Sequence, residues 1–399
     1  MKKYLSLLGI VVFTVAFVFL LQKCYKEYNI SIMDKNLKCI LNYKGLKGAQ
    51  DFASDGAGNF YVAFKNRIQF IGSKGDSYDI LKDDDLEINS LEYTNGELYY
   101  ASKCQIYCYS LKDKKQRVIM SDLPNLGDYK DSCIRVKEDN VYISIGAATN
   151  SGVVGSDNKW LKENPFFYDL SPNEIVLKGK NFGSEKTGAF VSYKTKNVPS
   201  QVISGHFPGN ASIIVYNIKD NSSRTFAWGI RNVTGMDFNS EGKLLAATGG
   251  MEKRGIRPVV GDYDYVYEIN NNVWYGWPDY SGGDPINSPR FRVSAKEKID
   301  FILDKHPSSS PPAPLYQHKG VGSMGSIAID KFEYLGEKDS IYFYDIKDNN
   351  ICELNKNNIL SEKIKLNKAS KVTSIKFLEG KLSILDSEQG CIYTLVKNK

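Results

Sequence analysis

The sequence predicts an all-β protein, a six-bladed β-propeller preceded by an N-terminal transmembrane helix. A strand-like phrase recurs six times along the 399 residues. The composition favours strands, with 26 Tyr against 3 His, because tyrosine fits the half-buried face of a sheet. An uncharged run of 18 residues, 4–21, stands close to the N-terminus. The repeat predicts the propeller, and the run predicts the helix.

The repeated phrase consists of a turn, a short aromatic or β-branched run, and a small residue. Its six copies are GNFYVA at Gly58, GELYYA at Gly96, DNVYIS at Asp139, GKLLAA at Gly242, DSIYFY at Asp339 and GKLSIL at Gly380. An alternating run often precedes each copy and another follows it, so each unit has at least three strands. Units of this kind repeated radially form a propeller, which leaves only short, protected strand edges. A solenoid or an up-and-down barrel fits the irregular spacing less well.

The spacing of the copies also predicts where long insertions lie. The short units repeat about every 40 residues, within the range for propeller blades. Two gaps, between Asp139 and Gly242 and between Gly242 and Asp339, are wider. They contain SGVVGSDNKWLKENPFF and PGNASIIVYN in the first case, and WYGWPDYSGG and PSSSPPAPLYQH in the second. Long loops in a compact domain are usually functional or disordered, so we expect functional residues there.

The N-terminus divides the chain into three parts: residues 1–24 as a membrane anchor or signal segment, 25–36 as a stalk, and 37–399 as the propeller. A helix of 18 residues spans about 27 Å, close to the thickness of the hydrocarbon core. The run ends in Gln22-Lys23-Cys24 without a small-residue cleavage site, which favours an uncleaved anchor. We therefore expect a single-pass protein of the cell membrane with an extracytoplasmic propeller. The alternative is secretion after signal cleavage.

Charge and cysteine content exclude several classes of protein. The net charge is +6, but lysines and acidic residues alternate along the chain, so nucleic acid is not an expected partner. The seven cysteines include no C-x-x-C pair and no zinc spacing. Cys104 and Cys108 are too far apart on one expected strand to form a disulfide. We expect buried free thiols.

A pattern in the second half of the chain carries a family resemblance. It consists of WGIRN, GKLLAATGG, GDYDYVYEI and WYGWPDYSGG, all between residues 228 and 283. The pattern resembles the glucose/sorbosone dehydrogenase family, the soluble aldose sugar dehydrogenases that use pyrroloquinoline quinone (PQQ). The segments VYISIGAATNSG and PPAPLYQHKGVGSMG are similar to other parts of that family. The resemblance implies a six-bladed propeller, in agreement with the repeat count, and implies PQQ and Ca²⁺ as cofactors.

The resemblance assigns Arg231, Asn232 and Lys347 to cofactor binding. PQQ is a planar quinone with three carboxylates, and a guanidinium can both pair with a carboxylate and stack on a ring. Two alternatives remain open at these positions. Arg231 could pair with Asp264 and tie two loops together, and Lys347 could be a solvated turn lysine.

Two sets of oxygen ligands are candidates for a Ca²⁺ site. By resemblance, backbone carbonyls around Gly249 and Gly250 would contact the ion, since Ca²⁺ takes oxygen ligands. A further candidate comes from nearby carboxylates: Asp262, Asp264, Asp279 and Asp284. The alternatives are a simple chain bend at the glycine pair and ordinary solvated turns at the acids.

The aromatic residues of WYGWP raise a similar choice. Tyr275 and Trp277 could form a shelf on which the apolar face of a sugar stacks. They could instead pack as a plug between blades, with Gly276 supplying the turn and Pro278 stiffening it. Both arrangements close one end of the propeller channel.

The catalytic base is where this sequence departs from the family pattern. Oxidation of a sugar hydroxyl needs a group that accepts its proton, and the family uses a histidine. The corresponding position here is Asp128 or Tyr129. His318, in PLYQH, is the candidate catalytic histidine, with an ordinary polar role as the alternative. Lys368 and Lys371 stand where the family has an arginine pair.

These observations leave two main functions open. The first is a membrane-anchored, PQQ-dependent oxidoreductase that acts on the CH–OH group of sugars. The second is a non-catalytic surface propeller that binds a cell-wall glycan or a protein partner. The retained GIRN and YGWP motifs favour the first, and the missing histidine and arginines favour the second. A metal-dependent hydrolase of the lactonase type is a third, weaker alternative.

Overall fold

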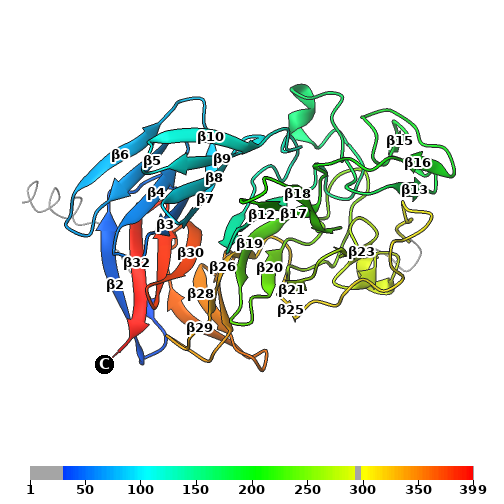
Figure 1. Cartoon of the computed structure of the whole chain (residues 1–399). Helices are drawn as coiled ribbons and strands as arrows, with labels where there is room; N and C mark the ends of the chain where they lie inside the picture. The colour runs from blue at the N-terminus through cyan, green and yellow to red at the C-terminus, as the bar shows by residue number, and fades with distance from the viewer. Residues whose placement is uncertain (1–29, 293–297, 399) are drawn as a thin grey trace, which may run out of the picture.

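The computed structural model describes residues 30–292 and 298–398, which form six antiparallel sheets around one axis (Figure 1). The first blade consists of β3 (Asp51–Ser54), β4 (Phe60–Phe64), β5 (Arg67–Ile71) and β6 (Ser77–Lys82). The second consists of β7 (Ile88–Thr94), β8 (Glu97–Ser102), β9 (Gln105–Ser110) and β10 (Lys115–Met120). The third consists of β11 (Ile134–Lys137), β12 (Asn140–Ile145), β17 (Ser212–Asn217) and β18 (Ser223–Trp228). The predicted all-β six-bladed propeller is confirmed.

The last three blades follow the same order from the axis outward. The fourth blade consists of β19 (Val233–Phe238), β20 (Leu244–Thr248), β21 (Tyr265–Ile269) and β25 (Tyr316–Gln317). The fifth consists of β26 (Met324–Asp330), β27 (Ser340–Asp345), β28 (Asn350–Leu354) and β29 (Leu360–Lys365). The sixth consists of β30 (Val372–Leu378), β31 (Lys381–Asp386), β32 (Cys391–Lys397) and β2 (Leu37–Lys44). The innermost strands contact one another in sequence, and β30 contacts β3 to complete the circle.

The ring is closed by strands from the two ends of the described chain. β2 pairs antiparallel with β32, with Leu37 opposite Lys397, so the sixth blade contains strands from both ends. Figure 1 shows these strands side by side in blue and red. β1 (Ser31–Ile32) pairs with β29, so the described part of the segment before residue 37 lies along the fifth blade.

The repeated phrase marks the second strand of every blade. β4 and β20 are buried along their whole length, because a neighbouring blade covers each face of these strands. Outer strands such as β6 and β10 are largely exposed. The glycine that opens the phrase has a positive φ, for example 84° at Gly58 and 80° at Gly96, which a side chain would disfavour.

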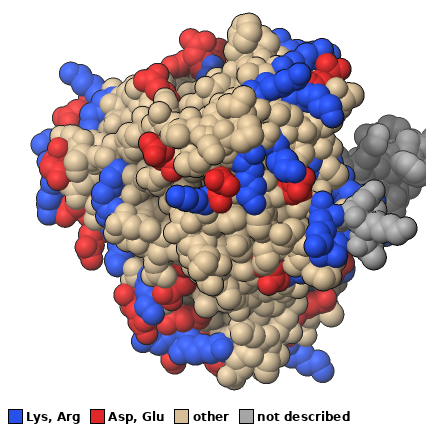
Figure 2. Space-filling view, turned by 90° about the vertical axis from the view of Figure 1, so that its right-hand side faces the viewer, with Lys and Arg blue, Asp and Glu red and all other residues tan. Residues whose placement is uncertain are grey.

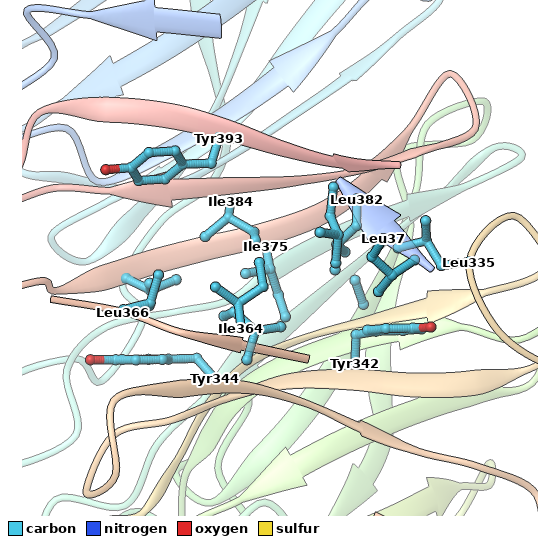
Figure 3. Close-up of a cluster of buried hydrophobic side chains, with 14 of the residues drawn as sticks. Leu37, Leu335, Tyr342, Tyr344, Ile364, Leu366, Ile375, Leu382, Ile384 and Tyr393 are labelled. Carbon is cyan, nitrogen blue, oxygen red and sulfur yellow. The ribbon is translucent and has the colours of Figure 1, made fainter. Parts of the chain in front are cut away.

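The hydrophobic core lies between blades rather than at the axis. One cluster fills the space between the fifth and sixth blades (Figure 3). Ile364 and Tyr344 from the fifth blade pack against Ile375, Ile384 and Tyr393 from the sixth. Similar clusters join the other neighbouring blades, so each sheet is held through both of its faces.

The two wide gaps contain the outer strands and long insertions. The short ladders are β13 (Ile175–Leu177) with β16 (Gln201–Ile203), β14 (Asn181–Phe182) with β15 (Thr187–Gly188), and β23 (Tyr280–Ser281) with β24 (Asp284–Pro285). The strand β22 (Val273–Trp274) lies between β21 and β25 of the fourth blade in sequence but pairs parallel with β18 of the third. The face in Figure 2 carries interspersed positive and negative residues.

Helices are short in the described part of the chain, where two 3₁₀ turns occur, η1 (Lys159–Lys162) and η2 (Pro289–Phe291). None of the described helices is long and apolar enough to cross a membrane. The predicted transmembrane run, residues 4–21, lies outside the described residues. The six described cysteines are free thiols, three of them buried.

A buried acid in the first insertion predicts a pH-dependent stability. Burial raises the pKa of Asp169 to about 7 from its ordinary value of 3.8, although Thr149 and the Ala148 amide donate hydrogen bonds to it. The contribution of the protonated Asp169 carboxyl to the free energy of unfolding is fully present below about pH 4 and is lost as pH rises through about 7. A tenfold change in equilibrium corresponds to about 1.4 kcal/mol, so the loss amounts to at most about 4 kcal/mol.

Asp169→Asn is therefore expected to match the wild type in melting temperature near pH 4 and to exceed it at pH 8. The measurement is thermal unfolding at several pH values. Asp113→Asn, on an exposed turn, is the matched control for the loss of one carboxylate. A constant difference between Asp169→Asn and the wild type across this range would contradict the assignment.

Candidate functional site

A cleft of about 720 Å³ opens where the second and third blades meet the loops that follow β10, β12 and β20. Its wall includes six acidic and four basic residues: Glu87, Asp128, Asp131, Asp157, Glu163 and Glu252, with Lys103, Lys130, Lys159 and Arg254. Tyr129 and Trp160 supply aromatic surface. The cleft is large enough for a sugar-sized ligand, and its wall is mostly polar.

The two residues at the family's base position lie in this wall. Asp128 accepts hydrogen bonds from Trp160 Nε1 at 2.9 Å, Asn158 Nδ2 at 2.9 Å and Arg254 Nη2 at 2.6 Å. The Tyr129 hydroxyl donates to Glu252 at 2.7 Å and accepts from Arg254. Both side chains are therefore fixed by protein partners, which reduces their freedom to accept a proton from a ligand.

Arg231 lies beneath Tyr129 and is 5 % exposed. Its Nε donates to the Asn150 carbonyl at 3.0 Å, and its Nη1 donates to the carbonyls of Gly249 at 3.3 Å and Gly250 at 2.5 Å. Its Nη2 contacts Asn150 Oδ1, Glu252 and the Tyr129 hydroxyl. All three guanidinium nitrogens are thus engaged.

The environment of Arg231 has a further consequence for its charge. The Tyr129 ring lies 4.1 Å from the guanidinium carbon, within range of a cation–π contact. Burial lowers the pKa of Arg231 to about 10, against the opposing effect of Glu252. Its ion-pair partner is Glu252 at 2.9 Å, so the alternative in which it pairs with Asp264 is not observed.

Asp264 instead holds backbone amides. Its carboxylate accepts hydrogen bonds from the amides of Gly250, Gly322, Ser323 and Met324 at 2.7–3.1 Å. This contact joins the loops that follow β20 and β25. Gly250 is required for the close approach, because a Cβ there would lie 2.0 Å from the Tyr263 carbonyl oxygen.

The four aspartates considered as Ca²⁺ ligands are held by protein partners, and Asp262 and Asp284 share Arg290. Asp262 accepts from Met251 N and the Tyr265 hydroxyl, Asp279 pairs with Arg257 at 2.7 Å, and Asp284 pairs with Arg290 at 2.6 Å. Among the described residues, no group of three or more His, Cys, Asp or Glu side chains could hold a metal ion. The four carboxylates therefore do not gather as a Ca²⁺ site in the described part of the chain, and Asp264 as a metal ligand stays a prediction.

His318 is buried at 2 % exposure between the fourth and fifth blades. Its Nε2 lies 3.1 Å from Asp345 and its Nδ1 lies 3.0 Å from the Tyr316 hydroxyl, so both ring nitrogens are occupied. Burial alone would raise the pKa of Asp345, but hydrogen bonds from His318 and Lys319 hold it below its usual range. A catalytic role for His318 stays a prediction, and this geometry favours the alternative polar role.

The remaining predicted cofactor residues differ in position. Asn232 lies beside Arg231, and its carbonyl accepts from the Gly249 amide at 2.9 Å. Lys347 is exposed in the turn after β27 and lies near Gly320. Arg231, Asn232, Gly249 and Gly250 therefore come together, while Lys347 lies on the surface.

Tyr275 and Trp277 are 3 % and 5 % exposed, as the packing alternative expected. The Tyr275 hydroxyl donates to the Glu268 carbonyl at 2.6 Å, and Trp277 Nε1 donates to the Asn150 carbonyl at 3.2 Å. They border an internal cavity of about 30 Å³, which has room for one or two waters. In this structure neither ring offers a shelf to a sugar.

Sequence reasoning missed Glu252, Arg254 and Asn150. Arg254 joins Asp128, Asp157 and Glu252 at 2.6–2.9 Å, and Asn150 donates to the Glu252 carbonyl at 2.8 Å. One signal was available, because the charged run MEKR follows the Gly249-Gly250 pair directly. Its partners lie about 100 residues earlier, so their identity required the fold.

The residues assigned to PQQ do not fit that group in the observed arrangement. The Arg231 guanidinium fills the place between the Gly249 and Gly250 carbonyls, which the resemblance gives to a cation. The same guanidinium has no nitrogen left for a PQQ carboxylate. Binding of PQQ and Ca²⁺ would require these contacts to break.

Arg231→Ala is expected to destabilise the protein by about 3 kcal/mol or more, because the buried carbonyls that accept hydrogen bonds from the guanidinium would lose their donor. Lys347→Ala, on an exposed turn, is expected to change stability by less than about 0.5 kcal/mol. Chemical denaturation of both variants measures the difference. A stable Arg231→Ala variant would contradict the structural role of this arginine.

Comparison with known proteins supplies the fold relationship. No protein-family model matches the sequence, and no curated protein matches it. Solved structures do match over nearly the whole chain. A carbohydrate-active enzyme of family AA12 from Trichoderma reesei has a TM-score of 0.62 and 12 % identity, with coverage of 94 % of this chain and 98 % of that one.

Two further matches are the PQQ domain of pyranose dehydrogenase from Coprinopsis cinerea and the PQQ-bound aldose sugar dehydrogenase from Streptomyces coelicolor. Their TM-scores are 0.61 and 0.56, their identities are 10 % and 13 %, and each alignment covers 93 % of this chain and 98 % of the other. The expected resemblance is thus confirmed in the fold. The chain has the propeller fold of the soluble sugar dehydrogenases.

Proposed function

We propose that this chain is an extracytoplasmic propeller that binds a carbohydrate in the cleft beside Tyr129 and has no quinone cofactor. The observation that carries the proposal is the complete engagement of Arg231 by protein acceptors, while a cleft of about 720 Å³ stays open above it. The sugar dehydrogenase scaffold is kept, and its cofactor position is filled by an arginine side chain.

The chemistry of the cleft suits a polyhydroxylated ligand. Carboxylates and side-chain amides accept and donate hydrogen bonds to hydroxyl groups, and an aromatic face covers the apolar side of a sugar ring. Asn89 and Asn125 line the cleft as well. A ligand in the cleft would therefore meet side-chain amides beside the carboxylates of the wall.

The place of the protein in the cell is part of the proposal. The uncharged run at residues 4–21 supports a single membrane anchor with the propeller outside the cytoplasm. A propeller in that position would meet cell-wall glycans. The three matched proteins are a carbohydrate-active enzyme, a pyranose dehydrogenase domain and an aldose sugar dehydrogenase, which supports a sugar as the ligand class.

A PQQ-dependent oxidoreductase acting on the CH–OH group of sugars is the second candidate. Two matched structures are described as PQQ proteins, and the chain keeps Arg231 and Asn232 in the GIRN turn. In such an enzyme the quinone would accept the hydride. The engaged state of Arg231 and the surface position of Lys347 weigh against it.

The glycan proposal is tested with the full chain in a detergent that lacks a sugar headgroup. Titration with oligosaccharides from cell walls is followed by calorimetry and by fluorescence of Trp160, which borders the cleft. Asn89→Ala is expected to weaken binding about tenfold, because one hydrogen bond to the ligand is lost. Asn66→Ala, at a partly buried asparagine between β4 and β5 of the first blade, is the matched control.

The oxidoreductase is tested in the same preparation with PQQ and Ca²⁺. We expect no saturable change in cofactor absorbance at tens of micromolar. Saturable binding that Asn232→Ala abolishes would overturn the proposal in favour of the oxidoreductase. Binding of neither glycan nor PQQ would also overturn it and would leave a protein partner as the remaining alternative.

A further inference from the structure

The first described strand fixes where the chain enters the propeller. β1 pairs antiparallel with β29, with Ser31 opposite Lys365. The Met33 amide donates to the Lys363 carbonyl at 3.0 Å, and the Lys363 ammonium pairs with Asp34 at 2.9 Å. These contacts hold the segment against the outer edge of the fifth blade. Because β29 ends at Lys365, the chain reaches β1 from the rim of the ring at which β29 ends.

The same rim carries the cleft. β8, β12 and β20 all end there, and the loops that follow these strands line the cleft. The rim continues toward the fifth blade, because Asp264 joins the loops after β20 and β25. After β27 the Ile346 amide donates to the Ser323 carbonyl at 2.8 Å, and after β29 the Leu366 amide donates to the Asn349 carbonyl at 2.9 Å. The chain thus enters the propeller on the side to which the cleft opens.

The expected anchor is joined to this rim by a short stretch of chain. Ile30 packs against the cluster between the fifth and sixth blades, and the eight residues 22–29 separate it from the uncharged run at 4–21. A fully extended chain covers about 3.3–3.6 Å per residue, so these eight residues reach at most about 29 Å. With the uncharged run in a bilayer, the propeller is tethered by the cleft rim, and the cleft faces the lipid surface.

Apolar side chains at the edge of the polar cleft are an independent observation. Leu126 lines the cleft and is 39 % exposed, and Phe166 is 81 % exposed. Phe166 lies in the turn where the Phe167 amide donates to the carbonyl of Asn164, another residue of the cleft wall, at 3.1 Å. The Phe167 ring packs edge-on against Trp160 at 5.5 Å, which fixes the turn and leaves Phe166 in solvent. A polar cleft with an apolar edge matches an amphiphilic ligand.

We propose that the cleft binds the saccharide headgroup of a membrane glycolipid, whose alkyl part contacts Phe166 and Leu126. The inference rests on the proposed function, because it requires a carbohydrate in the cleft and an anchor at residues 4–21. It adds the source of that carbohydrate, a lipid in the same bilayer as the anchor. Two partners held at one surface meet at a high effective concentration, so a modest affinity for the sugar is sufficient.

The first test asks whether the cleft rim meets lipid. The full chain is reconstituted in phosphatidylcholine vesicles with the photo-reactive amino acid benzoylphenylalanine in place of Phe166. A matched variant carries the same group in place of Phe332, which is 67 % exposed between β26 and β27 at the opposite rim. Irradiation is expected to crosslink phosphatidylcholine at position 166 and not at position 332. Crosslinking that is absent at position 166, or equal at the two positions, would overturn the proposal.

The second test separates the sugar from the alkyl chain. An oligosaccharide that binds in the calorimetric titration is prepared as its methyl and its octyl glycoside. The wild type is expected to bind the octyl glycoside about tenfold more tightly, because part of the alkyl chain leaves water. Phe166→Ser is expected to lose most of this preference and to keep the affinity for the methyl glycoside. Phe332→Ser, in the same detergent, is the matched control and is expected to keep the preference.

The outcomes distinguish this inference from the carbohydrate proposal. Equal affinity of the wild type for the two glycosides would overturn the glycolipid and leave a carbohydrate ligand in place. Binding of no oligosaccharide would overturn both proposals. A preference for the octyl glycoside that Phe166→Ser leaves intact would contradict the contact between Phe166 and the alkyl chain.

Discussion

Closure of the ring is the constraint on which the rest of this structure depends. Six sheets can surround an axis only if the first and last strands meet, and here β2 from the beginning of the described chain completes the sheet of β30, β31 and β32. Closure packs every sheet between two neighbours and leaves only short, protected strand edges. It also brings six inner strands together around the axis. Their polar side chains must then form hydrogen bonds and ion pairs with one another in a narrow space.

That narrow space explains why the axis is polar and the core lies elsewhere. Large apolar residues fill the interfaces between sheets, where area is plentiful, as in the cluster around Ile364 and Ile384. The axis receives charged residues that pair across blades, such as Lys376 of β30 with Glu92 of β7. The Arg231 network repeats this solution at the end of the ring, where Glu252 and Asn150 hold the guanidinium.

Much of the fold could be predicted from the sequence because strand chemistry is local. Each second strand is buried on both faces, so its apolar run stands out, and the turn glycine before it marks its beginning. The site was less accessible. The GIRN and GKLLAATGG motifs identified Arg231 and the Gly249-Gly250 pair as parts of one site, yet the partner of Arg231 could not be predicted, because Glu252 becomes its neighbour only through the paths of two loops. Similarly, β22 lies between two strands of the fourth blade in sequence but joins the third blade, where Trp274 packs in a buried cluster.

The pairing of β2 with β32 also has a consequence for biosynthesis. Leu37 is synthesised long before its partner Lys397, so β2 remains unpaired until β32 has been made. An unpaired strand edge is a template for aggregation, and contacts between distant residues form slowly. The nascent propeller therefore depends on protection of β2 during synthesis, and a ribosome that stops before β32 yields a ring that cannot close.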